Sequence, residues 1–304
     1  MTASILVVGS VAFDSLKTPF GVADEILGGS ATYFSVAASY FAPVNVVAVV
    51  GSDFPEKHFD VFRKHKVDIS GLVQVPGRTF RWKGEYGYDL NEARTLDTQL
   101  NVFETFKPEI PEAFKACQYV FLGNIDPELQ LSVLDQVSGP RVVACDSMNF
   151  WIKGKLEAVK KTIARVDILI INDTEARMLA DEPNLVKAAG KILAMGPKTL
   201  IVKRGEYGVL MFNGKSVFGA PAFPLEDVFD PTGAGDTFAG GFMGALAQAG
   251  EINERVFRRS IIFGSVMASF NVEKFGLQRL TDLTREEIDG RFRQFKHLTH
   301  FEEL

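Results

Sequence analysis

Short runs of apolar, largely β-branched residues recur along this chain, and helix-like segments separate most of them. Continuous apolar runs that alternate with helices are typical of a parallel sheet whose two faces are both covered. The sequence therefore predicts a doubly wound α/β fold with a mainly parallel sheet flanked by helices. Ligands of such folds bind beyond the carboxyl ends of the strands, so the residues after each run are candidates for a functional site. The runs span residues 4–8, 44–50, 119–123, 141–145, 166–171 and 199–203.

Two stretches interrupt this alternation, one at 13–27 and the other at 72–102. The second combines alternating polar and apolar residues with turn glycines and has no helical period. Both are predicted to form antiparallel strands. Since neither stretch is long enough to fold alone, we expect them to form one small β lid that projects from the main body. The sequence contains no linker, so residues 1–304 are predicted to form a single domain.

The composition argues against several classes of protein. A formal net charge of −5 over 304 residues does not favour binding to nucleic acid or to an anionic membrane. No segment approaches the ~18 consecutive apolar residues of a transmembrane helix. The first residues have no basic segment before their apolar run, unlike a signal peptide. Cys117 and Cys145 border apolar runs and are expected to be buried thiols of a protein in the reducing cytoplasm.

The stretch FDPTGAGDTFAGGFMGALAQAG, residues 229–250, contains six of the chain's 27 glycines. From Phe238 onward, its small and apolar residues recur at the spacing of one face of an α-helix. Glycine inside a helix costs about 1 kcal/mol relative to alanine. The glycines at 240, 241 and 244 are therefore predicted to mark places where another backbone packs closely.

The start of this helix has the features of an anion-binding site. Gly233, Ala234 and Gly235 precede the regular pattern, so their amides have no large side chain in front of them. Asp236 follows, and a carboxylate would repel a phosphate unless it has another task there. It would have one if it oriented a hydroxyl group that attacks the phosphate and took its proton. The alternative is that Asp236 only caps the helix and that the glycines form a tight turn.

The segment DPTGAGDTFAGGFM, residues 230–243, resembles the signature of the PfkB, or ribokinase-like, family of carbohydrate and nucleoside kinases, and weaker similarities extend from Ile5 to about Gly276. The resemblance implies a ribokinase-like fold and ATP-dependent phosphorylation of a hydroxyl or hydroxymethyl group. The acceptor would be a sugar or a ribonucleoside. In this interpretation Asp236 is the general base, and the amides of Gly233, Ala234 and Gly235 form the anion hole.

The resemblance also extends to the binding site of the acceptor. VVGSVAFDS is similar to the first strand of the family, which implies that Asp14 binds substrate hydroxyls; the alternative is a solvated turn aspartate. GGSATYFSVAA is similar to the segment that opens the first helix beneath the substrate. The sugar kinases of the family usually carry an asparagine where this chain has Tyr33, which speaks against a simple ribokinase or fructokinase. The implied acceptor-binding residues are Asp14, Gly28, Gly29, Ser30 and Tyr33.

INDTEA resembles the Asn-x-x-Glu motif of the family, which implies that Asn172 binds ATP and that Glu175 lies near Mg²⁺, through water. The same spacing after a strand is typical of a helix capping box, and both interpretations can hold together. VKRGEYG and FGSVMASFNVEKFG resemble nucleotide-binding segments. The further ATP-binding residues implied in this way are Lys203, Gly205, Gly208, Ser265 and Gly276, and the carbonyls of Asp230 and Thr232 match those that bind a monovalent cation such as K⁺ in some relatives.

Five aromatic residues, at 13, 80, 82, 86 and 88, fall in the predicted lid. Such residues usually pack in a core, and the alternative is that one or two stack on a nucleobase. Together with Tyr33, this favours a nucleoside. Other interpretations of the chain stay open: a binding or regulatory protein that has lost catalysis, and a kinase for another small alcohol such as a vitamin precursor. The resemblance also implies a homodimer that pairs through the lid.

Overall fold

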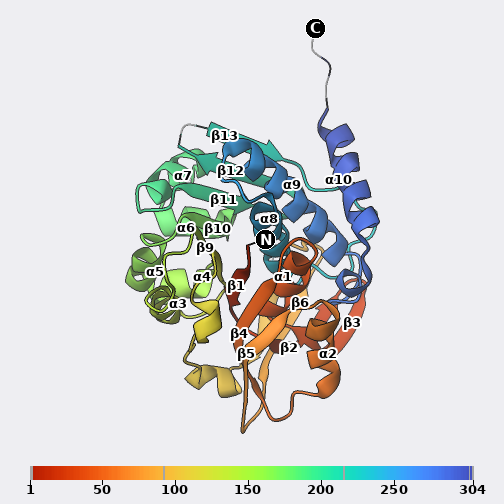
Figure 1. The fold of residues 1–304 in the computed structure, drawn as a ribbon. Coiled ribbons are helices and arrows are strands. Elements are labelled where there is room, and N and C mark those ends of the chain that lie inside the picture. Colours follow the sequence, from red (N-terminus) through yellow and green to blue (C-terminus); the bar gives the residue numbers. More distant parts are fainter. Residues whose placement is uncertain (1–2, 92, 215, 301, 303–304) are drawn as a thin grey trace.

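The computed structural model describes residues 3–91, 93–214, 216–300 and 302, which form a large and a small β-sheet (Figure 1). In chain order the elements are β1 (Ile5–Val8), β2 (Ala12–Thr18), β3 (Gly21–Gly28), α1 (Ser30–Ser39), β4 (Val44–Gly51), α2 (Glu56–Lys64), β5 (Asp68–Val75), β6 (Phe80–Tyr86), β7 (Ala93–Gln99), β8 (Tyr119–Leu122), α3 (Pro127–Leu134), β9 (Val142–Cys145), α4 (Asn149–Gly154), α5 (Leu156–Ile163), β10 (Ile168–Asn172), α6 (Asp173–Ala180), α7 (Leu185–Leu193), β11 (Thr199–Lys203), β12 (Val209–Asn213), β13 (Ser216–Ala220), α8 (Ala234–Ala249), α9 (Glu254–Asn271) and α10 (Arg285–Thr299).

The large sheet has the strand order β13-β12-β11-β10-β9-β8-β1-β4-β5 and is parallel from β11 to β5. Its strand residues alternate between two separate cores, because successive side chains point to opposite faces of a sheet. Ile5 and Val7 belong to a core that includes residues of α1, α8 and α9. Leu6 and Val8 belong to the other core, with residues of α3 to α7. The predicted α/β fold with helices on both faces is confirmed.

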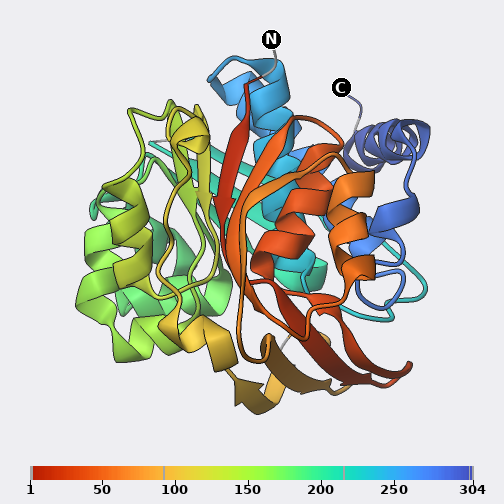
Figure 2. The same ribbon diagram turned by 60° about the horizontal axis from the view of Figure 1, so that its bottom comes forward.

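The small sheet has the order β3-β2-β6-β7 and lies at the bottom of Figure 2. Two details differ from the prediction. β2 and β6 pair in parallel, although the other neighbours in this sheet are antiparallel. Residues 72–75, predicted for the small sheet, belong to β5 at the edge of the large sheet. The polar and apolar residues of β5 alternate because several of its side chains face solvent, and a strand of a lid shows the same pattern.

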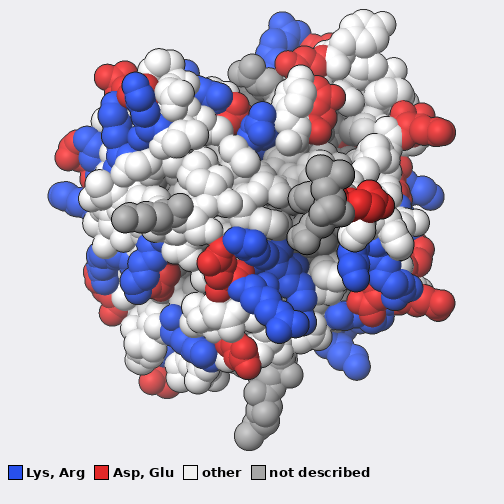
Figure 3. Space-filling view, turned by 90° about the horizontal axis from the view of Figure 1, so that it is seen from above, with Lys and Arg blue, Asp and Glu red and all other residues white. Residues whose placement is uncertain are grey.

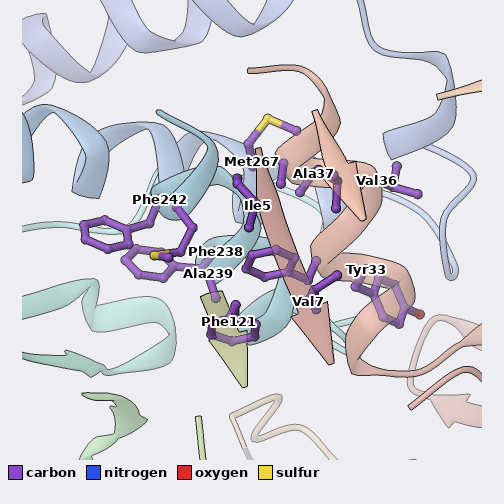
Figure 4. Close-up of a cluster of buried hydrophobic side chains, with 14 of the residues drawn as sticks. Ile5, Val7, Tyr33, Val36, Ala37, Phe121, Phe238, Ala239, Phe242 and Met267 are labelled. Atoms are coloured by element: carbon purple, nitrogen blue, oxygen red, sulfur yellow. The ribbon is translucent and has the colours of Figure 1, made fainter. Parts of the chain in front are cut away.

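Helix α8 is buried on all sides from Thr237 to Ala247, and not on one face as its pattern suggested. An ideal Cβ on Gly240 would lie 2.3 Å from the carbonyl oxygen of Phe34 in α1, and one on Gly241 would lie 2.9 Å from the carbonyl of Phe263 in α9. The predicted close approach of other backbones at these glycines is confirmed. Figure 4 shows side chains of α1 and α8 packed together over β1 and β8.

The surface agrees with the modest net charge. Figure 3 shows basic and acidic side chains interspersed over one face of the molecule, with no large area of a single sign. Among the described residues, no helix combines the length and the apolar character needed to cross a membrane.

Helical glycines that pack against another backbone and helical glycines that face open space should respond in opposite ways to substitution by alanine. Gly240→Ala should lower the free energy of unfolding by about 1–3 kcal/mol, because the new methyl group overlaps the backbone of α1. Gly190→Ala in α7 is the matched control: nothing lies within 4 Å of its ideal Cβ. That substitution should raise the free energy of unfolding by about 0.5–1 kcal/mol. Urea denaturation measures both, and equal stabilisation by the two would contradict the close packing of α8.

Candidate active site

The candidate site lies where β9, β10 and β11 end, opposite the first turn of α8. Asn172 and Lys203 are register neighbours at the ends of β10 and β11. The Nζ atom of Lys203 lies 3.2 Å from Oδ2 of Asp146, which directly follows β9. The same Nζ lies 2.9 Å from the position of an ideal Cβ on Gly235, so the ammonium group packs against the start of α8. The fold thus brings Lys203, the Asn172 turn and the glycine-rich helix start together.

The start of α8 is a helix N-terminus without a side-chain cap. Gly233 occupies the N-cap position with φ of 72°, in the left-handed region that favours glycine. Asp236 is the third residue of the helix and caps nothing, so the alternative of a simple capping aspartate does not hold. The Ala234 amide donates to the Pro231 carbonyl at 3.2 Å, whereas no described residue accepts a hydrogen bond from the Gly235 amide. The same holds for the Gly233 amide, so of the three predicted amides those of Gly233 and Gly235 have the clearest capacity to bind an anion.

The carboxylate of Asp236 lies in an electrostatic environment suited to accepting a proton near neutral pH. Burial raises its pKa to about 7, and the nearby carboxylate of Asp146 adds to this effect. The Lys203 ammonium opposes it and lowers the pKa. A carboxylate with a pKa near 7 has the strength that general bases show in enzymes.

Asp146 was not predicted as a site residue from the sequence. It directly follows one of the six apolar runs, where ligands of this fold bind. It is buried, and its carboxylate accepts from the Ser147 amide at 2.8 Å as well as from Lys203. Burial disfavours the charged form of Lys203, but the carboxylates of Asp146 and Glu175 outweigh this and raise its pKa. Burial and the charge of Asp146 raise the pKa of Glu175 to about 7.

Asn172 and Glu175 form a complete capping box at the start of α6. The Asn172 side chain accepts from the Glu175 amide at 2.8 Å, and Glu175 Oε2 accepts from the Asn172 amide at 2.7 Å. The second carboxylate oxygen of Glu175 is a hard oxygen ligand of the kind that Mg²⁺ prefers. Among the described residues, no cluster of three or more acidic, His or Cys side chains is arranged to hold a metal alone. Mg²⁺ fits here with phosphate oxygens and water as further ligands.

On the side of the small sheet, the carboxylate of Asp14 in β2 lies against the backbone of Gly28. An ideal Cβ on Gly28 would come within 1.9 Å of its Oδ2, so any larger residue at this position would displace the Asp14 carboxylate. Burial raises the pKa of Asp14 to about 7, and the charges of Asp230 and Asp236 add to the rise. Gly29, with φ of 94°, precedes α1 as its N-cap. Ser30 exchanges hydrogen bonds with Ser10, at 3.0 and 3.1 Å, and so ties α1 to the turn after β1.

Tyr33 links the two sides of the site. Its ring packs against Gly233, where an ideal Cβ would lie 2.4 Å from the ring. Its hydroxyl oxygen points away from the centre of the apolar cluster in Figure 4 and is buried without a hydrogen-bond partner among the described residues. Burial raises the pKa of this phenol well above its ordinary value, and the charge of Asp14 is the next largest cause. A buried hydroxyl without a partner is a group that a bound molecule can satisfy.

The loop before α8 is tied down by Asp230, which is fully buried. Its two carboxylate oxygens accept from the amides of Thr232 and Gly276, both at 2.8 Å. The Thr232 carbonyl accepts from the Asn271 side chain at 2.8 Å, and the Thr232 hydroxyl lies 3.2 Å from that of Tyr86. These bonds connect the α8 loop to α9 and to the small sheet. A monovalent cation at the carbonyls of Asp230 and Thr232 stays a prediction.

The register of β2 and β6 places an aromatic residue opposite Asp14, and its indole Nε1 donates to the Thr95 hydroxyl of β7 at 3.2 Å. Trp82 is the register partner of Asp14, and Tyr86 lies on the same face of β6 because it is four residues further on. The Trp82 indole covers Gly84, whose ideal Cβ would lie 2.2 Å from the ring. The other aromatic residues of the predicted lid lie elsewhere: Phe13 stacks on Phe54, Phe80 stacks on Phe103, and Tyr88 is exposed.

The predicted nucleotide-binding segment forms a tight turn after β11. Gly205 and Gly208 have φ of 54° and 85°, conformations that favour glycine. The Glu206 amide of this turn donates to Oδ1 of Asn91, in the β6–β7 connection, at 3.3 Å. Ser265 lies buried within α9, next to Gly264, which packs on Phe238 of α8. Gly276 contacts Ile26 of the small sheet as well as Asp230.

The chain matches the model of the pfkB family of carbohydrate kinases over residues 4–283. Among curated proteins it is similar to the cytidine kinase of Thermococcus kodakarensis, with 30% identity over 261 residues that cover 83% of this chain and 91% of the relative. It is also similar to the ribokinase of Lactococcus lactis, with 27% identity over 290 residues that cover 90% of this chain and 92% of the relative.

Solved structures share this fold. The nucleoside kinase of Methanocaldococcus jannaschii superposes with a TM-score of 0.77 at 21% identity, over 97% of this chain and 99% of its own. A putative ribokinase II of E. coli, solved in complex with ATP and Mg²⁺, superposes with a TM-score of 0.78 at 17% identity, again over 97% and 99%. The predicted ribokinase-like fold is confirmed.

The charges around Asp236 predict how its pKa responds to substitution. Lys203→Met should raise the pKa of Asp236 above 7, because it removes the ammonium that favours the carboxylate. Lys198→Met, at the opposite edge of the sheet, should leave it unchanged. Carboxyl ¹³C NMR of protein labelled at aspartate measures both titrations. An Asp236 that titrates near the ordinary value of about 4 would contradict the described environment.

Proposed function

The chain belongs to the pfkB family of carbohydrate kinases, and from this premise we propose that it transfers the terminal phosphoryl group of ATP to a hydroxyl group of a sugar or ribonucleoside. One observation carries the proposal: Asp236 lies in the first turn of α8, beside the Gly235 amide and the Lys203 ammonium. A base, an anion-binding amide and a cation thus meet at one point. Phosphoryl transfer requires this combination, because it depends on positioning and on stabilisation of charge.

In the proposed mechanism, the acceptor hydroxyl lies between Asp14 and Asp236. Asp236 orients this hydroxyl and takes its proton as the new O–P bond forms, while the bond from the terminal phosphorus to the bridging oxygen breaks and ADP leaves. The amides at the start of α8, those of Gly233 and Gly235 above all, stabilise the negative charge of the phosphoryl group. Asp14 binds a second acceptor hydroxyl, and the small sheet excludes water, which would otherwise compete as an acceptor.

ATP would lie along the ends of β10 and β11, with its phosphates toward Asn172, Lys203 and the turn at Gly205 and Gly208. Glu175 would hold Mg²⁺, directly or through water, and the ion would supply neutralisation of the phosphate charge. The two left-handed glycines support this placement, because a turn without side chains lets a nucleotide approach the backbone closely.

We propose a ribonucleoside as the acceptor in preference to a free sugar. Trp82, the register partner of Asp14, and Tyr86 lie on the same face of β6, where a base attached to the sugar could stack on them. Tyr33 offers a buried phenol in place of the asparagine of the sugar kinases. A relative with 30% identity to this chain is a cytidine kinase, and this supports the same choice.

The proposal predicts that ADP forms from ATP and Mg²⁺ when the acceptor is a ribonucleoside, in a coupled assay with a panel of nucleosides and sugars. Asp236→Asn should retain ATP binding by calorimetry and lose about 10²–10⁴ in kcat, since general-base catalysis contributes this much. Turnover of a free sugar above every nucleoside would overturn the choice of acceptor. ATP binding without ADP formation on any acceptor would favour a catalytically inactive binding protein.

Asp14→Ala should act mainly on the acceptor. We expect the KM of the acceptor to rise about tenfold or more with the KM of ATP unchanged, because one charge-assisted hydrogen bond is lost. Steady-state kinetics with each substrate varied in turn separates the two effects. An unchanged KM and kcat for the acceptor would remove Asp14 from the site.

A further inference from the structure

Asp146 has no role in the mechanism above, yet every polar group of this residue is held in place. Its backbone amide donates to the Leu122 carbonyl at 2.9 Å, and its carbonyl accepts from the buried Gln130 side chain at 3.0 Å. One carboxylate oxygen accepts from the Ser147 amide, and the other faces Lys203. The side chain therefore has one orientation, which depends on the ends of β8 and β9 and not on any flexible segment.

Lys203, by contrast, is a long side chain that needs a partner to hold one position. Its ammonium group packs beside Gly235, at the start of α8, where the partial positive charge of the helix dipole repels a cation. Burial adds a further cost for the charged form. Asp146 provides the compensating negative charge, with its Oδ2 3.2 Å from Nζ.

We infer that Asp146 is a positioning residue for phosphoryl transfer, and that its carboxylate holds the Lys203 ammonium at the point where the terminal phosphate of ATP meets α8. The inference rests on the proposed function for the identity of the ligand. Lys203 itself contacts the phosphate and is the catalytic member of the pair. Asp146 acts through it and makes no contact with the nucleotide.

A double-mutant cycle on nucleotide binding tests this without any acceptor. The variants are Asp146→Asn, Lys203→Met and the two combined. The dissociation constants of ATP and ADP, each with Mg²⁺, are measured by calorimetry. Lys203→Met should reduce the preference for ATP over ADP about tenfold, the value of one charge-assisted hydrogen bond to the terminal phosphate. Asp146→Asn should reduce it in the same direction, and in the Lys203→Met background it should cause no further change.

The chain contains a matched control pair at the amino ends of β10 and β11. Lys198 Nζ lies 2.8 Å from Oδ1 of Asp167, directly before β11 and β10. Asp167→Asn and Lys198→Met should leave the preference for ATP unchanged. Thermal unfolding of each variant checks that it is folded. If Asp146→Asn alone unfolds because it leaves a buried ammonium unpaired, the double variant compared with Lys203→Met alone still decides the question.

Three results would overturn the inference. The preference for ATP could be unaffected by Asp146→Asn in the native background. It could fall equally in both backgrounds, which would indicate a direct contact of Asp146 with the nucleotide. It could rise in both, which would indicate that Asp146 only repels phosphate. If no acceptor yields ADP, the proposed function fails separately, since the binding ratios are measured without turnover.

Discussion

The close contact between the backbones of α1 and α8 determines the geometry of the whole site. Gly240 approaches the Phe34 carbonyl, and Gly244 approaches the Ala38 carbonyl one turn further along. Each helix begins at one side of the site, since α1 follows Gly29 and α8 follows Gly233. Small residues therefore set the distance between the helix that starts beneath Asp14 and the one that carries Asp236. The loss of helix propensity at these glycines is offset by this precise approach.

Charge is concentrated where the strands of the large sheet end, and carboxylates outnumber cations there. Asp146, Glu175 and Asp236 contribute negative charge within reach of one buried ammonium, that of Lys203. The pKa values of Glu175 and Asp236 rise to about 7 for the same reasons, burial and the charge of Asp146. Such shifts cluster at functional sites, because a structural protein gains little from burying carboxylates together.

The sequence predicted the large sheet well, because buried parallel strands appear as uninterrupted apolar runs. It also predicted the helix start at Gly233 from its glycines. Asp146 was missed because a single aspartate after a strand has no distinctive spacing, and its pairing with Lys203 arises only when β9 and β11 lie in one sheet. The edge strand β5 was wrongly assigned to the lid, because a partly exposed edge strand and a lid strand both alternate polar and apolar residues. The local sequence pattern thus predicts helices and strands, whereas contacts between residues far apart in the sequence can be identified only from the folded structure.

The glycine at position 84 determines where the Trp82 indole can lie. The Trp82 indole lies on the backbone of Gly84, and an ideal Cβ at this position would lie 2.2 Å from the ring, which is closer than van der Waals contact. A methyl group there would displace the ring, because the indole already occupies that space. If Trp82 stacks on the acceptor as proposed, a substitution at position 84 would change which molecules fit while Trp82 itself stays the same.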